Sequence, residues 1–270
     1  MSFKEKLQQI DELQDAINVY GKIPVDVLKK INYKFRLEWN YTSNSMEGNS
    51  LTRSETRSVM VGNITVDGKP LKDILEIKGH DEVIVDILRI GKGELNISER
   101  RIREIHKVIM NEDDPAKRDM PGNWKKVNNY LYSYKKERID FAPPEDVPVL
   151  MHDLVNKLNA AQEKISRGDK DSVHPLVLAS RFHLDFVTIH PFYDGNGRMS
   201  RILSNMILIA NGYPPFYIKE SERLAYYQYL GDIQAYGGNT DLFYDYMAGL
   251  LLRSLQIQLD AIAGKDIDAY

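Results

Sequence analysis

The sequence contains no cysteine. This absence excludes disulfide bridges, thiolate metal sites and a cysteine nucleophile, and it is compatible with a reducing compartment. Basic and acidic residues nearly balance, with 36 Lys and Arg against 39 Asp and Glu, so a net charge of −3 gives no positive excess for binding nucleic acid. No run of about 18 apolar residues occurs, and the opening MSFKEKLQQIDELQD lacks the apolar core of a signal peptide. We therefore expect a cytoplasmic protein without membrane or nucleic-acid partners.

The composition and the spacing of apolar residues predict a folded, mainly α-helical chain. Hydrophobic residues make up 43% of the 270 residues and charged residues 28%, which is ordinary for globular proteins. Apolar residues recur at spacings of three and four over most of the sequence. Helices are expected around residues 7–17, from Pro24, from the capping pattern Thr52–Glu55, over 71–90, after Ser98, and over 144–165, 175–189, 198–211, 222–235 and 241–263.

One segment departs from the helical pattern. Residues 124–141, WKKVNNYLYSYKKERIDF, are rich in Val, Tyr and Ile and carry a polar cluster at Lys135–Glu137. This predicts a β-hairpin, which must pack on another part of the chain because an isolated hairpin is only marginally stable in water. No linker rich in Gly, Ser or Pro divides the sequence. We expect one mainly helical unit, in which an N-terminal helical region over residues 1–95 precedes residues 96–270.

The segment most informative about chemistry joins two of the expected helices and reads IHPFYDGNGRMSR over residues 189–201. Gly195 and Gly197 allow the tight turn that must lie between the helices. The amides after such a turn lie at a helix N-terminus, where the macrodipole favours an anion. Arg198 and Arg201 are three residues apart, so both project from one side of the first helical turn. Guanidinium groups beside exposed amides predict a polyphosphate site.

His190 and Asp194 precede this predicted phosphate site. A histidine can act as a general base near neutral pH, and a carboxylate close to phosphates suits Mg²⁺. Taken singly, a glycine-rich turn or a lone histidine is usually structural. The joint pattern is far less expected by chance, so we interpret it as a catalytic site.

The same residues resemble the signature of the Fic-domain family. Residues 190–201 match without a gap the pattern of His, any residue, Phe, any residue, Asp or Glu, Gly-Asn-Gly-Arg, two residues of any kind, and Arg. The resemblance implies a Fic fold, that is, a helical bundle with a β-hairpin flap and a helix–loop–helix active-site motif, with a catalytic domain over residues 96–270. Most members of this family transfer AMP from ATP to a protein hydroxyl, which implies ATP as substrate and Mg²⁺ as cofactor.

The resemblance also implies roles for the residues of the motif. His190 would deprotonate the Ser, Thr or Tyr hydroxyl of the target, and Asp194 would ligate Mg²⁺. Attack at the α-phosphorus needs positioning, charge neutralisation and a base, and the motif supplies groups for each.

Five residues of the motif would hold the phosphates of ATP. The amides of Gly195, Asn196 and Gly197, with the Asn196 side chain, would hold the α- and β-phosphates. Arg198 would bind phosphate oxygens, and Arg201 would reach the γ-phosphate.

The predicted hairpin takes the place of the flap in this family. Val127, Asn128, Asn129 and Tyr130 resemble its start, and the flap would hold a target segment by strand addition. The short Val-x-x-Gly form of the family is absent here, and the hairpin is longer.

A pair of tyrosines, Tyr226 and Tyr227, resembles the tyrosines that line the nucleotide side in relatives. On this resemblance Tyr227 is expected to contact ATP. Ordinary aromatic residues on a helix face would give the same pattern.

A second motif lies near the N-terminus. Ser43-Asn44-Ser45-Met46-Glu47-Gly48 matches the inhibitory pattern of the family, Ser or Thr, three residues of any kind, Glu, then Gly or Asn. The resemblance implies that Glu47 pairs with Arg201 and takes the place of the γ-phosphate, so that ATP is misaligned for attack. The alternative is a helix end at which Glu47 is solvated and Gly48 forms the C-terminal cap.

The leading hypothesis is therefore an autoinhibited protein AMP transferase. The same residues could remove AMP from a modified protein, and a non-catalytic nucleotide-binding interaction module is a further alternative. The retained His190, Asp194, Asn196 and paired arginines argue against the non-catalytic one. The target protein and the oligomeric state, including a homodimer, stay open, and the chain itself is a candidate target.

Overall fold

The chain folds as a mainly helical protein, as the sequence predicted. The computed structural model describes residues 1–62, 64–110, 115–133, 135–268 and 270. In these residues the elements are α1 (Phe3–Val19), α2 (Val25–Ser45), α3 (Arg53–Gly62), α4 (Leu71–Ile87), α5 (Glu99–Ile109), η1 (Pro115–Lys117), β1 (Tyr130–Tyr132), β2 (Arg138–Asp140), α6 (Val147–Arg167), α7 (Pro175–Ile189), α8 (Asn196–Ala210), η2 (Glu220–Glu222), α9 (Arg223–Tyr236) and α10 (Thr240–Ile262).

Local capping explains where several helices begin. At α3 the Thr52 hydroxyl accepts the amide of Glu55 (3.2 Å) and the Glu55 carboxylate accepts the amide of Thr52 (2.7 Å), the capping box that the sequence predicted. At α5 the Ser98 hydroxyl accepts the amide of Arg101 at 3.1 Å. Helix α8 begins two residues earlier than predicted, because Gly195 in the left-handed region (φ 79°) already forms its N-terminal cap.

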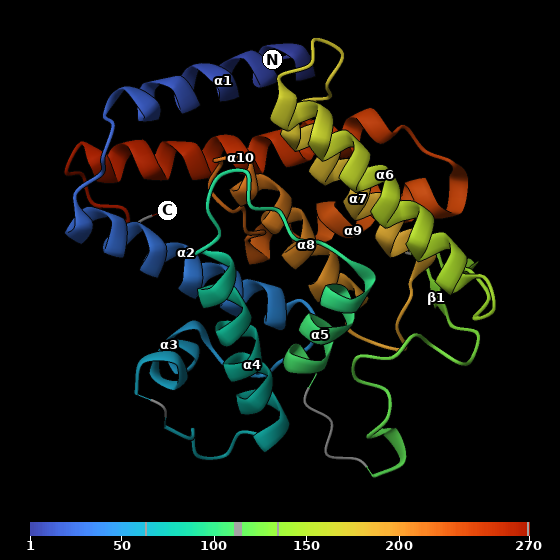
Figure 1. The fold of residues 1–270 in the computed structure, drawn as a ribbon. Helices are drawn as coiled ribbons and strands as arrows, with labels where there is room; N and C mark the ends of the chain where they lie inside the picture. The colour runs from blue at the N-terminus through green and yellow to red at the C-terminus, as the bar shows by residue number, and fades with distance from the viewer. Residues whose placement is uncertain (63, 111–114, 134, 269) are drawn as a thin grey trace.

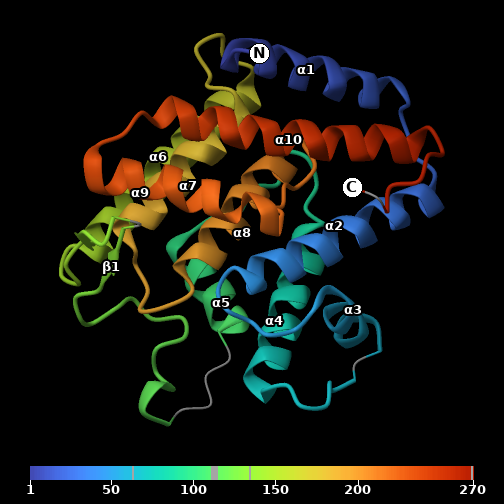
Figure 2. The same ribbon diagram turned by 180° about the vertical axis from the view of Figure 1, so that it is seen from behind.

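The helices are arranged around α7 and α8, which pack against each other along their length. Helix α6 covers α7, and α2 and α4 from the N-terminal region reach α8 on another side. Helix α1 lies along α10, at the edge of the molecule (Figures 1 and 2). Two N-terminal helices, α2 and α4, thus lie against the helix that begins within the Gly-rich motif.

One large apolar core joins the N-terminal region to the rest of the chain. It runs in sequence from Ile10 in α1 to Ile267 and includes Phe35 and Trp39 of α2 beside Ile202 of α8. A second, small cluster is formed by Leu51, Val59, Ile74 and Ile77. Among the helices of the described residues, none combines the length and the apolar character that crossing a bilayer requires.

The predicted β-hairpin is present, but its strands are short. Strands β1 and β2 pair antiparallel, with Tyr130 opposite Asp140 and Tyr132 opposite Arg138. Lys136 lies in the predicted turn with a positive φ of 62°. Residues 124–129, which the prediction included, form no strand and run as an irregular segment toward the Gly-rich motif.

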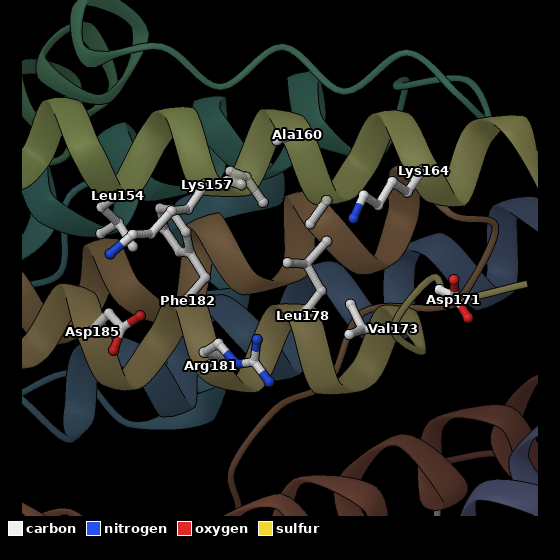
Figure 3. Close-up of a pocket in the computed structure, with 12 residues that line it drawn as sticks. Leu154, Lys157, Ala160, Lys164, Asp171, Val173, Leu178, Arg181, Phe182 and Asp185 are labelled. Atoms are coloured by element: carbon white, nitrogen blue, oxygen red, sulfur yellow. The ribbon is translucent and has the colours of Figure 1, made fainter. Parts of the chain in front are cut away.

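A groove of about 360 Å³ lies between α6 and α7 (Figure 3). Leu158, Leu178 and Phe182 contribute to its apolar floor, and the side chains of Lys157 and Arg181 lie at its rim. None of the residues singled out in the sequence lines this groove.

The packing of α10 predicts that two of its leucines differ strongly in their contribution to the free energy of unfolding. Leu251 is fully buried, whereas Leu242 is 55% exposed. Leu251→Ala should lower the free energy of unfolding by about 2–5 kcal/mol, because it removes buried methyl groups and leaves a cavity. Leu242→Ala, the matched control on the same helix, should change it by less than about 0.5 kcal/mol. Urea denaturation followed by circular dichroism measures both, and equal effects would contradict the placement of α10 in the core.

Candidate active site

The segment between α7 and α8 is held in place from inside. His190 follows α7 in the left-handed region (φ 53°), and its amide donates to the carbonyl of Phe186 at 2.9 Å. The Phe192 side chain is fully buried in the core. The Asn196 side chain accepts the amide of Phe192 (2.9 Å) and donates to the carbonyl of the same residue (2.9 Å). A non-glycine residue with positive φ persists only where its surroundings enforce it, and these contacts do so.

His106 of α5 anchors the loop from outside. Its Nδ1 accepts the amide of Gly122 (2.8 Å), so the ring proton lies on Nε2, which donates to the carbonyl of Asp194 (2.9 Å). The ring also stacks on Phe192, with centroids 3.6 Å apart and planes within 6°. Burial lowers the pKa of His106 to about 4, which keeps the ring neutral. No pattern in the sequence indicated this anchor, because His106 lies 88 residues from Asp194.

His190 has the geometry and the protonation state of a base. Its Nδ1 is 3.3 Å from the carbonyl of Val187, to which it can only donate, so Nε2 carries the lone pair. The ring stacks on Phe141, with centroids 3.8 Å apart and planes within 8°. Burial, partly offset by the Val187 hydrogen bond, lowers the pKa of His190 to about 4. The imidazole is therefore neutral at pH 7 and can take a proton.

Several of the residues predicted from the sequence line one cavity of about 300 Å³. They are Glu47, His190, Gly197, Arg201 and Tyr227. The cavity is completed by the end of the hairpin strand β1 and by α7 and α9, through Leu131, Tyr132, Ser133, Val187, Leu224, Tyr226, Gln228, Leu230, Gly231 and Gln234. The sequence named the hairpin as a whole, and Leu131, Tyr132 and Ser133 follow directly after the predicted flap residues.

Glu47 and Arg201 form an ion pair at one end of this cavity. Arg201 Nη2 donates to Glu47 Oε1 at 2.7 Å, with the side chain of Arg201 3% exposed and that of Glu47 25% exposed. Ser43, the first residue of the N-terminal motif, accepts from Arg201 as well, through its hydroxyl (3.0 Å) and its carbonyl (3.0 Å). The turn after α2 ends with Gly48 at φ 94°. The motif therefore forms a helix end at Gly48 and also the ion pair between Glu47 and Arg201.

Gly197 allows a close approach of the Glu47 carboxylate. A Cβ atom on residue 197 would lie 2.5 Å from Glu47 Oε1 and 3.2 Å from Arg201 Nη1. Such distances are shorter than van der Waals contact. The absence of a side chain at 197 lets the carboxylate lie against the first turn of α8.

Tyr226 and Tyr227 hold different positions on α9. Tyr226 is buried, and its hydroxyl is 2.8 Å from His183 Nε2. Burial, aided by the charge of Arg201, lowers the pKa of His183 to about 3, so this histidine is a neutral core residue. Tyr227 is exposed at the cavity, and its hydroxyl donates to the carbonyl of Met46 at 3.2 Å. Helix α9 therefore contacts the end of α2 that carries Glu47.

Other predicted residues of the motif lie beside the cavity and do not line it. Asp194 is exposed at a smaller cavity with His106, and its Oδ1 accepts the amide of Gly195 at 2.6 Å. The side-chain amide of Asn196 is engaged with the loop backbone. The guanidinium of Arg198 is buried and faces α4. The phosphate and metal roles of these residues stay predictions.

The predicted flap residues form the approach to β1. Val127, Asn128 and Tyr130 are exposed. Asn129 is tied to the loop, since its Nδ2 donates to the carbonyl of Phe192 (3.1 Å) and its Oδ1 accepts from Lys125 Nζ (2.6 Å). The hairpin is therefore connected to the motif directly.

Comparison with known proteins agrees with this arrangement. Residues 96–208 match the model of the Fic/DOC family. Two proteins named protein adenylyltransferase Fic are each 31% identical to the chain, one from Nematostella vectensis over 95% of this chain and 56% of that protein, and one from Drosophila grimshawi over 86% and 46%. A crystal structure of a Fic-domain-containing signalling protein from Bacteroides thetaiotaomicron superposes with a TM-score of 0.84 at 29% identity, covering 96% of this chain and 98% of that one.

The chain therefore has a Fic domain, whose signature is the loop between α7 and α8. Residues 96–208 belong to the Fic/DOC family. The chain spans about half the length of the curated relatives that it matches.

The stacking of Phe141 on His190 makes a prediction about the base. Phe141→Ala should raise the pKa of His190 from about 4 toward its ordinary value of 6.5, because water reaches the ring and solvates its charged form. NMR titration of labelled histidine rings measures this shift, with the His190 resonance assigned by its loss in His190→Gln. An unchanged low pKa in Phe141→Ala would show that the stacking does not shield the ring.

Proposed function

We propose that this protein is an autoinhibited AMP transferase, which moves AMP from ATP to a Ser, Thr or Tyr hydroxyl of a target protein. The observation that carries the proposal is that a neutral His190 and the first turn of α8 face one cavity, in which Glu47 is paired with Arg201. Membership of the Fic/DOC family and the likeness to adenylyltransferases over most of this chain support it.

The cavity has the groups that a nucleoside triphosphate requires. Its volume of about 300 Å³ lies at the lower end of the range of small-molecule sites. Tyr227 and Leu224 offer apolar surface for a base, and the start of α8 offers amides at the positive end of a helix dipole. Arg201 is the cation that faces the cavity beside these amides.

The proposed transfer follows from this placement. His190 Nε2 takes the proton of the target hydroxyl, whose oxygen attacks the α-phosphorus. A new O–P bond forms, the bond between the α-phosphorus and the bridging oxygen breaks, and pyrophosphate leaves with the electron pair. The α8 amides and Arg201 stabilise the charge that develops on the phosphate oxygens.

Asp194 is suited to hold Mg²⁺ with the phosphates. Its carboxylate is exposed, and Oδ1 is oriented by the amide of Gly195. The described residues contain no group of three or more His, Cys, Asp or Glu side chains that could hold a metal ion, and Asp194 is the carboxylate that we propose as the ligand. This donor set fits Mg²⁺, which commonly uses one or two carboxylates together with substrate phosphates and water. Bound there, Mg²⁺ would neutralise phosphate charge.

Autoinhibition is proposed to act through the N-terminal region, residues 1–95. Glu47 occupies the guanidinium of Arg201 that a γ-phosphate would otherwise engage. An ion pair with a partner that is 3% exposed is screened far less than a surface pair. Two contacts from α9 to the Met46 carbonyl, from Arg223 (2.8 Å) and Tyr227 (3.2 Å), fix the end of α2 in this position.

The target is proposed to bind along the hairpin. The side chains of Val127, Tyr130 and Tyr132 are exposed, and Tyr132 lines the cavity. A two-stranded sheet leaves edge amides and carbonyls free to pair with an extended segment. The hydroxyl to be modified would lie in that segment.

The inhibitory pair predicts a gain of activity. Glu47→Gly should raise AMP transfer, including transfer onto the protein itself, by roughly tenfold or more, a common size for coupling between sites. The measurement is incorporation of label from α-labelled ATP with Mg²⁺ in a cell lysate and in the pure protein. Glu47→Gln should act in the same direction, which separates loss of charge from the flexibility of glycine.

Three controls accompany this measurement. Glu12→Gly, at an exposed position of α1, should leave transfer unchanged. Adding Arg201→Ala to Glu47→Gly should abolish the gain, because both changes act on one contact and are not additive. Adding His190→Ala should lower transfer by about 10²-fold or more. A folded Glu47→Gly protein that binds ATP with unchanged transfer would refute the inhibitory role.

The metal role of Asp194 is tested in the Glu47→Gly protein. Asp194→Asn should raise the Mg²⁺ concentration for half-maximal transfer by roughly tenfold or more, since the carboxylate charge is lost while the carbonyl that accepts from His106 remains. Transfer rates over a Mg²⁺ titration measure this. The same Mg²⁺ dependence in both proteins would exclude Asp194 as the ligand.

A further inference from the structure

The two arginines of the motif face different helices. Arg201 faces the cavity and α2, whereas Arg198 lies on the far side, against α4 and α5. Arg198 Nη1 is 3.0 Å from Glu76 Oε1, and the side chains are 3% and 8% exposed. Arg198 Nη2 approaches the sulfur of Met110 at 3.0 Å. Among the described residues, Glu76 is the carboxylate with which Arg198 forms an ion pair.

Glu76 is itself held by the segment that follows the inhibitory motif. Its Oε2 accepts from Asn49 Nδ2 at 3.3 Å, and the same Nδ2 donates to the carbonyl of Asp73 at 2.9 Å. The amide of Asn49 donates to the carbonyl of Asn44, which lies next to Ser43 in α2. Glu76 therefore links the first turn of α8 to the same N-terminal segment that presents Glu47.

The surroundings of this pair are closed to solvent. His80, one helical turn after Glu76, is fully buried, and its Nδ1 is 2.9 Å from Asn44 Nδ2. Burial and the charges of Arg198 and Arg201 lower the pKa of His80 well below its ordinary range, so it adds no positive charge. In such an environment a guanidinium that loses its carboxylate is strongly destabilised, whereas an apolar pair of similar size is tolerated.

We propose that Glu76 is a positioning residue of the site and that Arg198 is its anchor point on α8, so that this pair fixes the first helical turn whose amides face the phosphates. In this arrangement the charge of Arg198 is neutralised by Glu76 and does not serve as a phosphate ligand. The inference departs from the role that the family resemblance implies for Arg198. It rests on the proposed function, because it assumes that ATP binds at the start of α8.

The logic of the test is that a positioning pair and a phosphate ligand respond differently when both charges are removed. If Arg198 only anchors α8, removing one partner of the pair weakens ATP binding, and replacing both partners by apolar side chains restores it. If Arg198 binds phosphate, the double variant stays as weak as the single one. All variants are made in the full-length Glu47→Gly protein, so that Arg201 is free of its inhibitor.

In that protein, Glu76→Gln and Arg198→Met should each reduce kcat/KM for AMP transfer by about ten- to a hundredfold, the scale of a misplaced binding turn. Glu76→Met combined with Arg198→Met should bring KM for ATP back to within about threefold of the Glu47→Gly protein. Asp81→Asn is the matched control, because it removes another carboxylate of α4, paired with Arg36 of α2. This control should leave KM unchanged.

Binding of MgATP is measured in parallel by the rise in melting temperature that it causes. Glu76→Gln should show a smaller rise than the Glu47→Gly protein, since a displaced turn binds phosphate less well. This readout decides the question even if the Met pair does not fold. An equal or larger rise in Glu76→Gln would mean that Glu76 withholds Arg198 from the phosphates, and it would overturn the proposal.

A double Met variant that folds but binds ATP as poorly as Arg198→Met would likewise overturn it. Failure of the proposed function looks different. In that case the Glu47→Gly protein transfers no AMP to any protein, while the ATP-dependent melting temperatures still report on Glu76.

Discussion

Two arginine charges on one turn of α8 lie out of contact with water, and most of the structure around the site follows from that constraint. A buried guanidinium needs a carboxylate nearby. Arg201 forms an ion pair with Glu47, just after the end of α2, and Arg198 forms one with Glu76 of α4. Both partners come from the N-terminal region, which also shares one apolar core with α7 and α8. The two ion pairs thus hold helices α2 and α4 against the first turn of α8.

Several of the groups that hold the loop are uncharged. The His106 ring donates to the carbonyl of Asp194, and the side-chain amide of Asn196 forms a hydrogen bond with the backbone of Phe192. The Phe141 ring stacks on His190. Burial lowers the pKa of His106 and of His190 to about 4. His190 is therefore neutral at physiological pH, the state that its proposed role as proton acceptor requires.

The sequence predicted the helices, the hairpin and the loop motif, because each leaves a local pattern of spacing, capping or residue type. It also brought Glu47 and Arg201 together, 154 residues apart, through a second short motif. It missed Glu76, His106 and Phe141, whose importance comes only from contacts between distant helices and loops. The hairpin was placed correctly, but its strands of three residues are too short for the sequence to fix which side chains reach the cavity.

The order of the elements along the chain has a consequence for biosynthesis. A polypeptide leaves the ribosome from its N-terminus, and its earlier segments are free to fold first. Glu47 and Glu76 are thus already outside when α8 is completed, since Glu47 precedes Arg201 by 154 residues. Each arginine can therefore meet its carboxylate once α8 has emerged. On the proposed function, the protein would be inhibited as soon as it folds, and its activity would have to be released afterwards.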